Sequence, residues 1–476
     1  MEWNFDNSYL KLPKVFYSYE YPDSLDNPEF VLFNNELAKK LNIEFNNKKK
    51  INFLKYLFKN KNNEYLKSFS QAYAGHQFGH FVNLGDGRAH IIGEHITKNN
   101  ERFDIQLKGS GKTPFSRNGD GKATLGTMVR EFIISESMHY LNIPTTRSLG
   151  VINTGEKILR NKHEDGGILI RVAQSHIRFG TFQFASIHKD KNYLTDLTQY
   201  TINRHFPELI NKENKIEKLL NLISINLINL IINWLRVGFI HGVMNTDNMS
   251  IVSETMDYGP CAFMDSYNPK TVFSSIDHKG RYSYENQANI GLWNLIRFTE
   301  SILLLIDKDE KIAIKKAEKI IKKYQNEFNK SWLKMMKNKI GLNEDNEKDI
   351  KLINELLDLM HVYKFDYTNT FVDLKNNELI KYKFFNSWLD KYKERIKLEK
   401  NNEFARKKLM EENNPTTIPR NHLIEKIIKE AESNKLDNLY SLLNYLKNTY
   451  NPINTPTEFN KPPSNEEKIF QTFCGT

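Results

Sequence analysis

The stretch "HGVMNTDNMS" at residues 241–250 places His, Gly, Asn and Asp directly behind an apolar segment that ends "WLRVGFI" at residues 234–240. Lys, Asn and Ile dominate most of the remaining chain, so a run of this kind is unusual in it. Asn and Asp oxygens are ligands that hard cations such as Mg²⁺ prefer. A loop of this composition behind a helix is therefore a candidate for chemistry.

The composition predicts a folded protein with a sizeable core. The chain has 476 residues, of which 39% are hydrophobic and 12% aromatic. This length suits two or three packed subdomains, or one large two-lobed unit with a tail. The net charge of +10 is spread along the chain, whereas nucleic-acid binding needs a focused basic face. We therefore expect no nucleic-acid partner.

The sequence also bears on the compartment. Two cysteines, Cys261 and Cys474, do not make a disulfide framework, and a reducing cytosol is the default. The N-terminus lacks signal or transit character. The most apolar stretch (219–235) carries asparagines at helical spacing, which favours a buried amphipathic helix over a membrane span. We expect a cytoplasmic monomer without a membrane partner.

The character of the chain changes along its length. Residues 70–185 are rich in glycine and contain alternating runs typical of strands, whereas helical patterns dominate 190–400. A further helical segment follows, and the last residues, "NPINTPTEFNKPPSNEEKIFQTFCGT", predict an irregular tail. The predicted fold class is α+β: a mixed lobe over 1–175, a helical lobe over 176–400, and a helical extension with a tail over 401–476.

A glycine-rich turn lies in the mixed lobe. In "LGDGRAHIIGE" (84–94), Gly85 and Gly87 allow backbone N–H groups to approach a phosphate, and Arg88 adds a forked donor. The alternative is an ordinary Asp-Gly hairpin. Two other motifs fail: "KGSGKTPFSR" (108–117) lacks the first glycine of a P-loop, and glycines in "YAGHQFGH" (73–80) argue against a helical zinc pair.

A lysine and a glutamate follow the turn. Alternation in "RFDIQLKGSG" (102–111) places Lys108 on the strand face opposite Ile105 and Leu107, so it points away from the apolar core of the lobe. The segment "LGTMVREFIISESMHYL" (125–141) predicts an amphipathic helix with Glu131 at the edge of its apolar stripe. Glu131 is therefore placed to reach Lys108, with a generic surface charge as the alternative.

The order of these parts is that of a protein kinase-like fold. Kinase catalytic loops carry Asp two residues after His and Asn five residues after that Asp. Here Asn248 occupies the Asn position, but Val243 occupies the Asp position. Asp257, in "DYG", follows nine residues after Asn248 and stands in for the metal-binding Asp-Phe-Gly. Such a pseudokinase lacks its usual base unless Asp247 replaces it.

Several long blocks in the right order resemble the selenoprotein O (SelO) family over nearly the whole chain. They are "QAYAGHQFGHFVNLGDGRA", "DIQLKGSGKTPFSRNGDGKATLGTMVREFIISE", "RVAQSHIRFGTFQF", "HGVMNTDNMSI", "DYGP", "DHKGRYSYENQ" and "NPTTIPRNHLIE". The resemblance implies a pseudokinase-like fold that binds ATP in an inverted orientation. It also implies transfer of AMP, with release of pyrophosphate, to Ser, Thr or Tyr hydroxyls of proteins, self-modification included.

The resemblance implies roles for individual residues. The base is Asp247, the metal ligands for Mg²⁺ or Mn²⁺ are Asn248 and Asp257, and Glu131 holds Lys108. The residues implied in ATP binding are Gly85, Gly87, Arg88, Lys108, Asp120, Gly121, Arg171, Arg178 and Asp257. UTP with manganese is implied as a second substrate. For Arg171 a strand-end arginine pairing with a carboxylate is the alternative.

The chain departs from the family pattern at its cysteines. It closes "FCGT" where the family has Cys-Ser-Ser, and Phe273 stands where bacterial relatives often have a second cysteine. Redox control through Cys261 and Cys474 is one interpretation, and a buried and a free thiol are the other. Two further functions stay open: a true kinase, for which Val243 is unexplained, and a non-catalytic nucleotide-binding scaffold.

Overall fold

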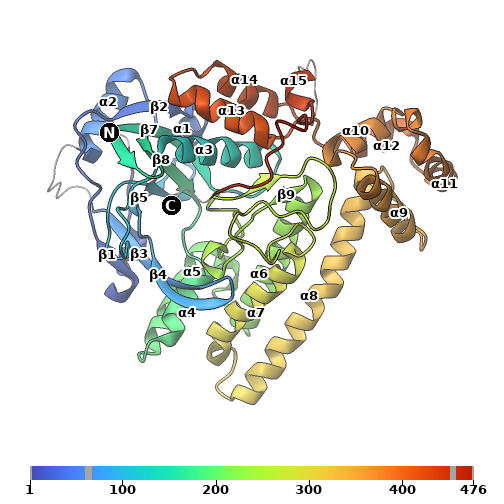
Figure 1. Cartoon of the computed structure of the whole chain (residues 1–476). Coiled ribbons are helices and arrows are strands. Elements are labelled where there is room, and N and C mark those ends of the chain that lie inside the picture. Colours follow the sequence, from blue (N-terminus) through green and yellow to red (C-terminus); the bar gives the residue numbers. More distant parts are fainter. Residues whose placement is uncertain (1–2, 59–66, 451–456, 474–476) are drawn as a thin grey trace.

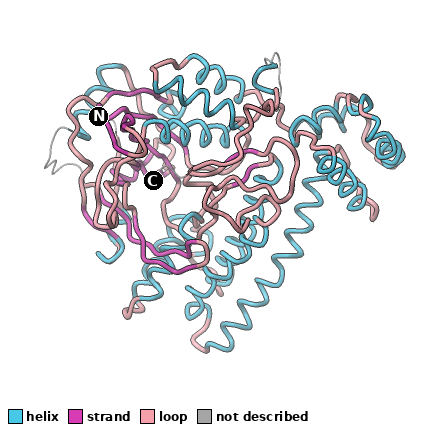
Figure 2. Tube along the Cα trace, viewed as in Figure 1, coloured by secondary structure: helices cyan, strands magenta, loops and turns pink. Residues whose placement is uncertain are grey.

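The computed structural model describes residues 3–58, 67–450 and 457–473, and it shows an α+β protein (Figures 1 and 2). An antiparallel sheet forms the first part of the chain, and helices form most of the rest. The helical part begins soon after the last long strand, β8, ends at Ala173. The α+β class predicted from the sequence is therefore correct.

The main sheet runs in the order β1-β3-β5-β6-β8-β7-β2, and β4 pairs with β3. Its strands are β1 (Tyr17–Tyr19), β2 (Glu29–Phe33), β3 (Phe69–Gln77), β4 (His80–Gly85), β5 (Ala89–Ile96), β6 (Arg102–Lys108), β7 (Arg147–Leu159) and β8 (His163–Ala173). A separate antiparallel pair joins β9 (Phe239–Ile240) to β10 (Ala262–Phe263). The central strands β6 and β8 bring Lys108 and Arg171 onto neighbouring positions of the sheet.

Helices cover both faces of the main sheet. On one face, α1 (Asn35–Lys40) and α2 (Asn47–Phe58) pack with Ile105 and Leu107 in an apolar cluster. On the other face lies α3 (Leu125–Tyr140), which begins at the N-cap Thr124 and packs against β7 and β8. Alternation in β6 therefore places Lys108 on the α3 side, away from the α1–α2 cluster, as predicted.

The helical part continues below and beside the sheet (Figure 1). Its helices are α4 (Phe179–Ile187), α5 (Asn192–His205), α6 (Lys215–Arg236), α7 (Gln287–Ile306), α8 (Glu310–Lys339), α9 (Asp349–Val362), α10 (Tyr367–Lys375), α11 (Asn386–Ile396) and α12 (Glu403–Asn413). The last helices, α13 (Asn421–Glu432), α14 (Asp437–Leu446) and α15 (Thr457–Asn460), return to the sheet, where α13 and α14 pack on α3. The C-terminal extension thus lies against the mixed part of the molecule.

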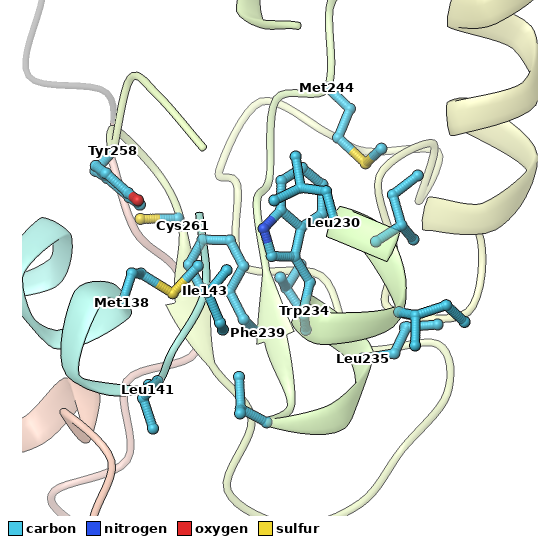
Figure 3. Packing of buried hydrophobic residues seen from close by; sticks show 14 of the residues in the cluster. Met138, Leu141, Ile143, Leu230, Trp234, Leu235, Phe239, Met244, Tyr258 and Cys261 are labelled. Atoms are coloured by element: carbon cyan, nitrogen blue, oxygen red, sulfur yellow. The ribbon is translucent and has the colours of Figure 1, made fainter. Parts of the chain in front are cut away.

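Two of these helices, α6 and α7, are long and apolar enough to span a membrane by length and composition. In the fold, 61% of the most apolar window of α6 and 50% of that of α7 are buried. The asparagines at 226, 229 and 233 lie on the more exposed side of α6, away from its packed residues. Core packing therefore explains the apolar face of α6, which supplies residues such as Leu230, Trp234 and Leu235 to the cluster in Figure 3.

Candidate functional site

A cavity of about 500 Å³ lies between the sheet and the helical part. Its lining comes from the glycine-rich turn, β6, α3, β8, the loop at 241–250 and the segment that begins at Asp257. Every residue predicted for ATP, base or metal lines it: Gly85, Gly87, Arg88, Lys108, Asp120, Gly121, Glu131, Arg171, Arg178, Asp247, Asn248 and Asp257. The fold therefore gathers the predicted positions into one place.

Asp257 is the centre of the cavity's charge. Its Oδ1 accepts from Lys108 Nζ at 2.9 Å and from Arg171 Nη2 at 2.7 Å, and its Oδ2 accepts from Arg178 Nη1 at 2.6 Å. Burial alone would raise the pKa of this carboxyl, but Arg171, Lys108 and Arg178 hold its pKa well below the usual range. One carboxylate thus holds three cations at the same place.

Glu131 joins this cluster from α3. Its Oε2 accepts from Lys108 Nζ at 2.7 Å, and its Oε1 accepts from Arg171. Burial raises the pKa of Glu131, but Arg171 and Lys108 outweigh that effect and lower it. The surface-charge alternative is wrong for this pair, because Lys108 and Glu131 are 6% and 3% exposed.

Arg171 lies two residues before the end of β8 and is 1% exposed. Its guanidinium contacts Glu131, Asp257 and the Gln106 side chain, the last at 3.2 Å. These contacts agree with the alternative given above for Arg171, an arginine near a strand end that pairs with carboxylates. They also leave Arg171 on the cavity wall beside Lys108.

Asp247 lies in a short 3₁₀ turn, Thr246–Asn248, and is 6% exposed. Its Oδ1 is buried and has no hydrogen-bond partner among the residues that the structure describes. Burial raises the pKa of its carboxyl to about 6, although Arg178 acts in the opposite direction. An unpartnered carboxylate oxygen in a buried position is unusual, because most buried polar atoms have a hydrogen-bond partner.

Two glycines let the strand β3 and the helix α4 approach this carboxylate. A Cβ atom at Gly75 would collide with the Asp247 side chain, and one at Gly180 would collide with the carbonyl oxygen of Ala74. His76 N also donates to Thr246 Oγ1 at 2.7 Å. The catalytic-loop stretch is therefore packed directly under β3.

Val243 has a structural role in the same loop. Its carbonyl oxygen accepts from Asn248 Nδ2 at 2.9 Å, which fixes the amide and directs its Oδ1 elsewhere. The Val243 side chain is apolar and buried. The loop thus keeps the Asn of the kinase pattern in a defined orientation without the kinase Asp.

The glycine-rich turn is not a hairpin between its flanking strands. β4 pairs with β3, and β5 pairs with β6 and β3. The hairpin alternative for Gly85 and Gly87 is therefore wrong, because the turn carries the chain from one partner strand to another. Thr113 Oγ1 donates to Asp86 O at 2.8 Å, which binds the turn to the loop that follows β6.

Other predicted positions lie at the rim or outside the cavity. Asp120 is bound to Arg160 at 2.8 Å and is far more exposed than Asp257. Cys261 is fully buried and does not line the cavity, and Cys474 lies outside the described residues. His76 and His80 lie on β3 and β4 rather than on a helix, as the glycines beside them indicated.

Sequence reasoning missed two polar neighbours of the site. Gln77 lines the cavity together with Asp247 and acts to lower the pKa of its carboxyl, which the place of Gln77 at the end of β3 did not reveal. Asp86 lies between the two glycines of the turn, and its Oδ2 accepts from Gln106 Nε2 at 3.2 Å. Its position inside a phosphate-type turn was the available signal.

A buried acid three residues before Asp257, Glu254, provides a stability test. Burial raises the pKa of Glu254 to about 8, and its Oε2 accepts from Gln174 N at 3.0 Å. Because the folded protein holds a proton here that the unfolded chain releases above its ordinary pKa, this contribution to stability is lost as the pH rises through about 8. The free energy of unfolding of Glu254→Gln should therefore rise relative to that of wild type, by about 1 to 4 kcal/mol between pH 6 and pH 9.

Thermal or urea unfolding of both proteins at the two pH values measures this gain. A difference between variant and wild type that stays constant with pH would contradict it.

Comparison with known proteins adds a further finding. Residues 1–447 match the family model described as "Protein adenylyltransferase SelO". The chain is 49% identical to "Protein nucleotidyltransferase YdiU" of Pelagibacter ubique, covering 100% of this chain and 99% of the relative. Relatives of the same name from Nitrosococcus oceani and Clostridium perfringens are 46% and 47% identical, covering 100% of this chain and 97% and 98% of theirs.

Proposed function

The chain belongs to the SelO family of protein adenylyltransferases, and on this premise we propose that it transfers AMP from ATP to Ser, Thr or Tyr hydroxyls of proteins, releasing pyrophosphate. The observation that carries the proposal is the pairing of two features in one cavity. Asp257 gathers three cations, and Asp247, whose Oδ1 has no hydrogen-bond partner among the described residues, lines the same cavity.

In this proposal the fold is a kinase-like, two-lobed one. The sheet with α3 corresponds to the first lobe (1–175), the helices up to α11 to the second (176–400), and the last helices to an extension (401–476). The contact of Lys108 on a central strand with Glu131 on the helix that covers it supports this assignment.

The basic groups form a site for phosphates. Lys108, Arg171 and Arg178 are held together by Asp257 and Glu131, so their positions are fixed before a nucleotide binds. Preorganised cations stabilise charge that develops on a leaving group at little reorganisation cost. This arrangement favours a reaction in which pyrophosphate leaves toward these residues and Arg88. UTP offers the same phosphates, which supports it as a second substrate.

Asn248 can supply an oxygen donor to a divalent metal bound together with a nucleotide, and Asp257 can supply another where phosphates take over the three cations that its oxygens hold. Among the described residues no group of three His, Cys, Asp or Glu side chains forms a metal site by itself. Mg²⁺, however, is usually held by one or two protein carboxylates together with substrate phosphates. Asn248 and Asp257 would hold Mg²⁺ or Mn²⁺, which would neutralise phosphate charge during transfer.

Asp247 is proposed as the proton acceptor. Asp247 lines the cavity, where an acceptor hydroxyl would approach the nucleotide, and its Oδ1 lies against Gly75 without a hydrogen-bond partner among the described residues. The packing of the Asp247 side chain against Gly75 fixes the carboxylate in place. A hydroxyl that donates to this carboxylate would lose its proton to it as the new bond to phosphorus forms and the bond to pyrophosphate breaks.

Labelled nucleotides separate this function from its alternatives. With Mg²⁺ and ATP labelled on the α-phosphate, we expect label on the protein itself or on an added protein, and mass increments of one AMP. Transfer of γ-label with phosphate-sized increments would instead establish a kinase. Nucleotide binding without any modification would favour a scaffold.

A further inference from the structure

The helix α13 binds one edge of the segment that follows Asp257. The strand β10 in this segment pairs with β9 through Ala262 and Phe263. Two carbonyl groups of the segment accept from side chains of other helices. The Cys261 carbonyl accepts from Arg130 Nη2 of α3 at 2.9 Å, and the Phe263 carbonyl accepts from Asn421 Nδ2 of α13 at 3.1 Å. Because a strand repeats every two residues, positions 261 and 263 present their carbonyls to the same side.

Arg420 binds the same segment two residues further along, at the side chain of Asp265. Its Nη1 donates to Asp265 Oδ1 at 2.7 Å and to Asp366 Oδ2 at 2.9 Å. The guanidinium is 1% exposed, and Arg420 is the N-cap residue of α13. The start of α13 therefore holds two points of the segment that begins at Asp257, and α3 holds a third through Arg130.

Helix α13 also packs against α3 and forms an ion pair with it. Arg130 Nη1 forms an ion pair with Glu425 Oε1 at 2.9 Å, while its Nη2 reaches Cys261 O. Ile424 and Ile427 of α13 are buried, and the Ile428 side chain lies against Gly126 so closely that a Cβ there would be 3.0 Å from Cγ2. Figure 3 shows Tyr258 and Cys261 beside Met138 of α3, within the same apolar cluster.

We propose that α13 is a built-in positioning element for nucleotidyl transfer, with Arg130, Arg420 and Asn421 as positioning residues. Glu131 and Asp257 bind the same lysine but come from two separate elements, α3 and the segment after the catalytic loop. Arg130 directly precedes Glu131, and α13 is bonded to both elements. It therefore fixes the distance between the two carboxylates. The inference rests on the proposed function in taking these carboxylates as parts of the nucleotide site.

The backbone conformation of Asp257 is unfavourable by itself, so the segment needs contacts that stabilise it. Its φ is +62°, in the left-handed region that non-glycine residues adopt at a cost. Such a conformation persists only where the surroundings hold it. The contacts to Cys261, Phe263 and Asp265 supply support within eight residues of Asp257.

The test uses the full-length chain with Glu425→Gln, which removes the charge that binds Arg130, and Asn421→Ala, which removes the donor to Phe263. The matched control is Glu430→Gln, because Glu430 is on the same helix but accepts from Asn438. Without nucleotide, amide hydrogen exchange in 257–265 should be about tenfold faster in both variants and unchanged in the control. The kcat per folded molecule should fall about tenfold, with KM for ATP nearly constant.

Glu425→Asp keeps the carboxylate and should recover part of kcat, which a purely structural loss would not predict. Exchange rates and kcat like those of the control, or a fall in kcat that only follows the unfolded fraction, would overturn the inference. If wild-type protein transfers no AMP, the proposed function fails instead, and the exchange measurement still decides whether α13 holds the segment.

Discussion

Asp247→Asn is expected to lower the rate of AMP transfer by about a hundred- to ten-thousand-fold, the usual effect of removing a general base, while ATP still binds. The amide has nearly the shape of the carboxylate, so the packing against Gly75 is kept. What it loses is an acceptor for the hydroxyl proton. Initial rates of α-label incorporation and calorimetric titration with ATP measure the two effects separately.

The matched control for this variant is Asp190→Asn, the same chemical change at an exposed position whose side chain accepts from Asn192 N. It should keep wild-type transfer. If Asp247→Asn retains a rate within a few-fold of wild type, Asp247 is not the base, and another proton acceptor must be sought on the cavity wall.

Asp257→Asn should cost several kcal/mol of transition-state stabilisation, or about a thousandfold or more in transfer. Asn248→Ala should have an effect in the same direction. The two substitutions should differ, however, in their effect on the stability of the fold. Asp257 is bound to three cations, and removing one partner of a buried ion pair typically costs about 3–5 kcal/mol. Asp257→Asn should therefore also lower the stability of the fold, because the Asp257 carboxylate is not a freely solvated group.

The same contacts predict how ATP changes the stability of the variant. In wild type, phosphates must compete with Asp257 for Lys108, Arg171 and Arg178, whereas in Asp257→Asn those cations lack their charge partner. Without metal, ATP should therefore raise the melting temperature of the variant more than that of wild type. Full transfer by Asp257→Asn at saturating Mg²⁺, or an equal thermal shift in both proteins, would contradict this account.

The sequence predicted the parts of the site better than their surroundings. Alternation in β6 and the apolar stripe of α3 were enough to place Lys108 opposite Glu131, because strand and helix periods are local properties. Spacing from Asn248 was enough to identify Asp257. Each of these inferences needs only residues close together in sequence.

What the sequence did not reveal depends on contacts between distant segments. The glycine-rich turn reads locally as a hairpin, and only the pairing of β4 with β3 excludes this. The capture of Asp257 by Arg171 and Arg178 joins three segments, and the bond from Arg130 to Glu425 spans 295 residues. Such pairings follow from the whole fold, and no local period encodes them.

The close approach at Gly75 and Gly180 has a consequence for motion. Kinase-like enzymes often open and close by rotating one lobe against the other, which requires a gap that can widen or narrow at their contact. Here a single methyl group would not fit between β3 and the Asp247 turn, or between α4 and β3. Under the proposed function this edge would act as a fixed pivot, and the distance from Asp247 to the nucleotide would be set when the chain folds. Substrates would then reach the cavity past its other lining residues, which include Ser116 and Gly119, without one part of the molecule closing on the other.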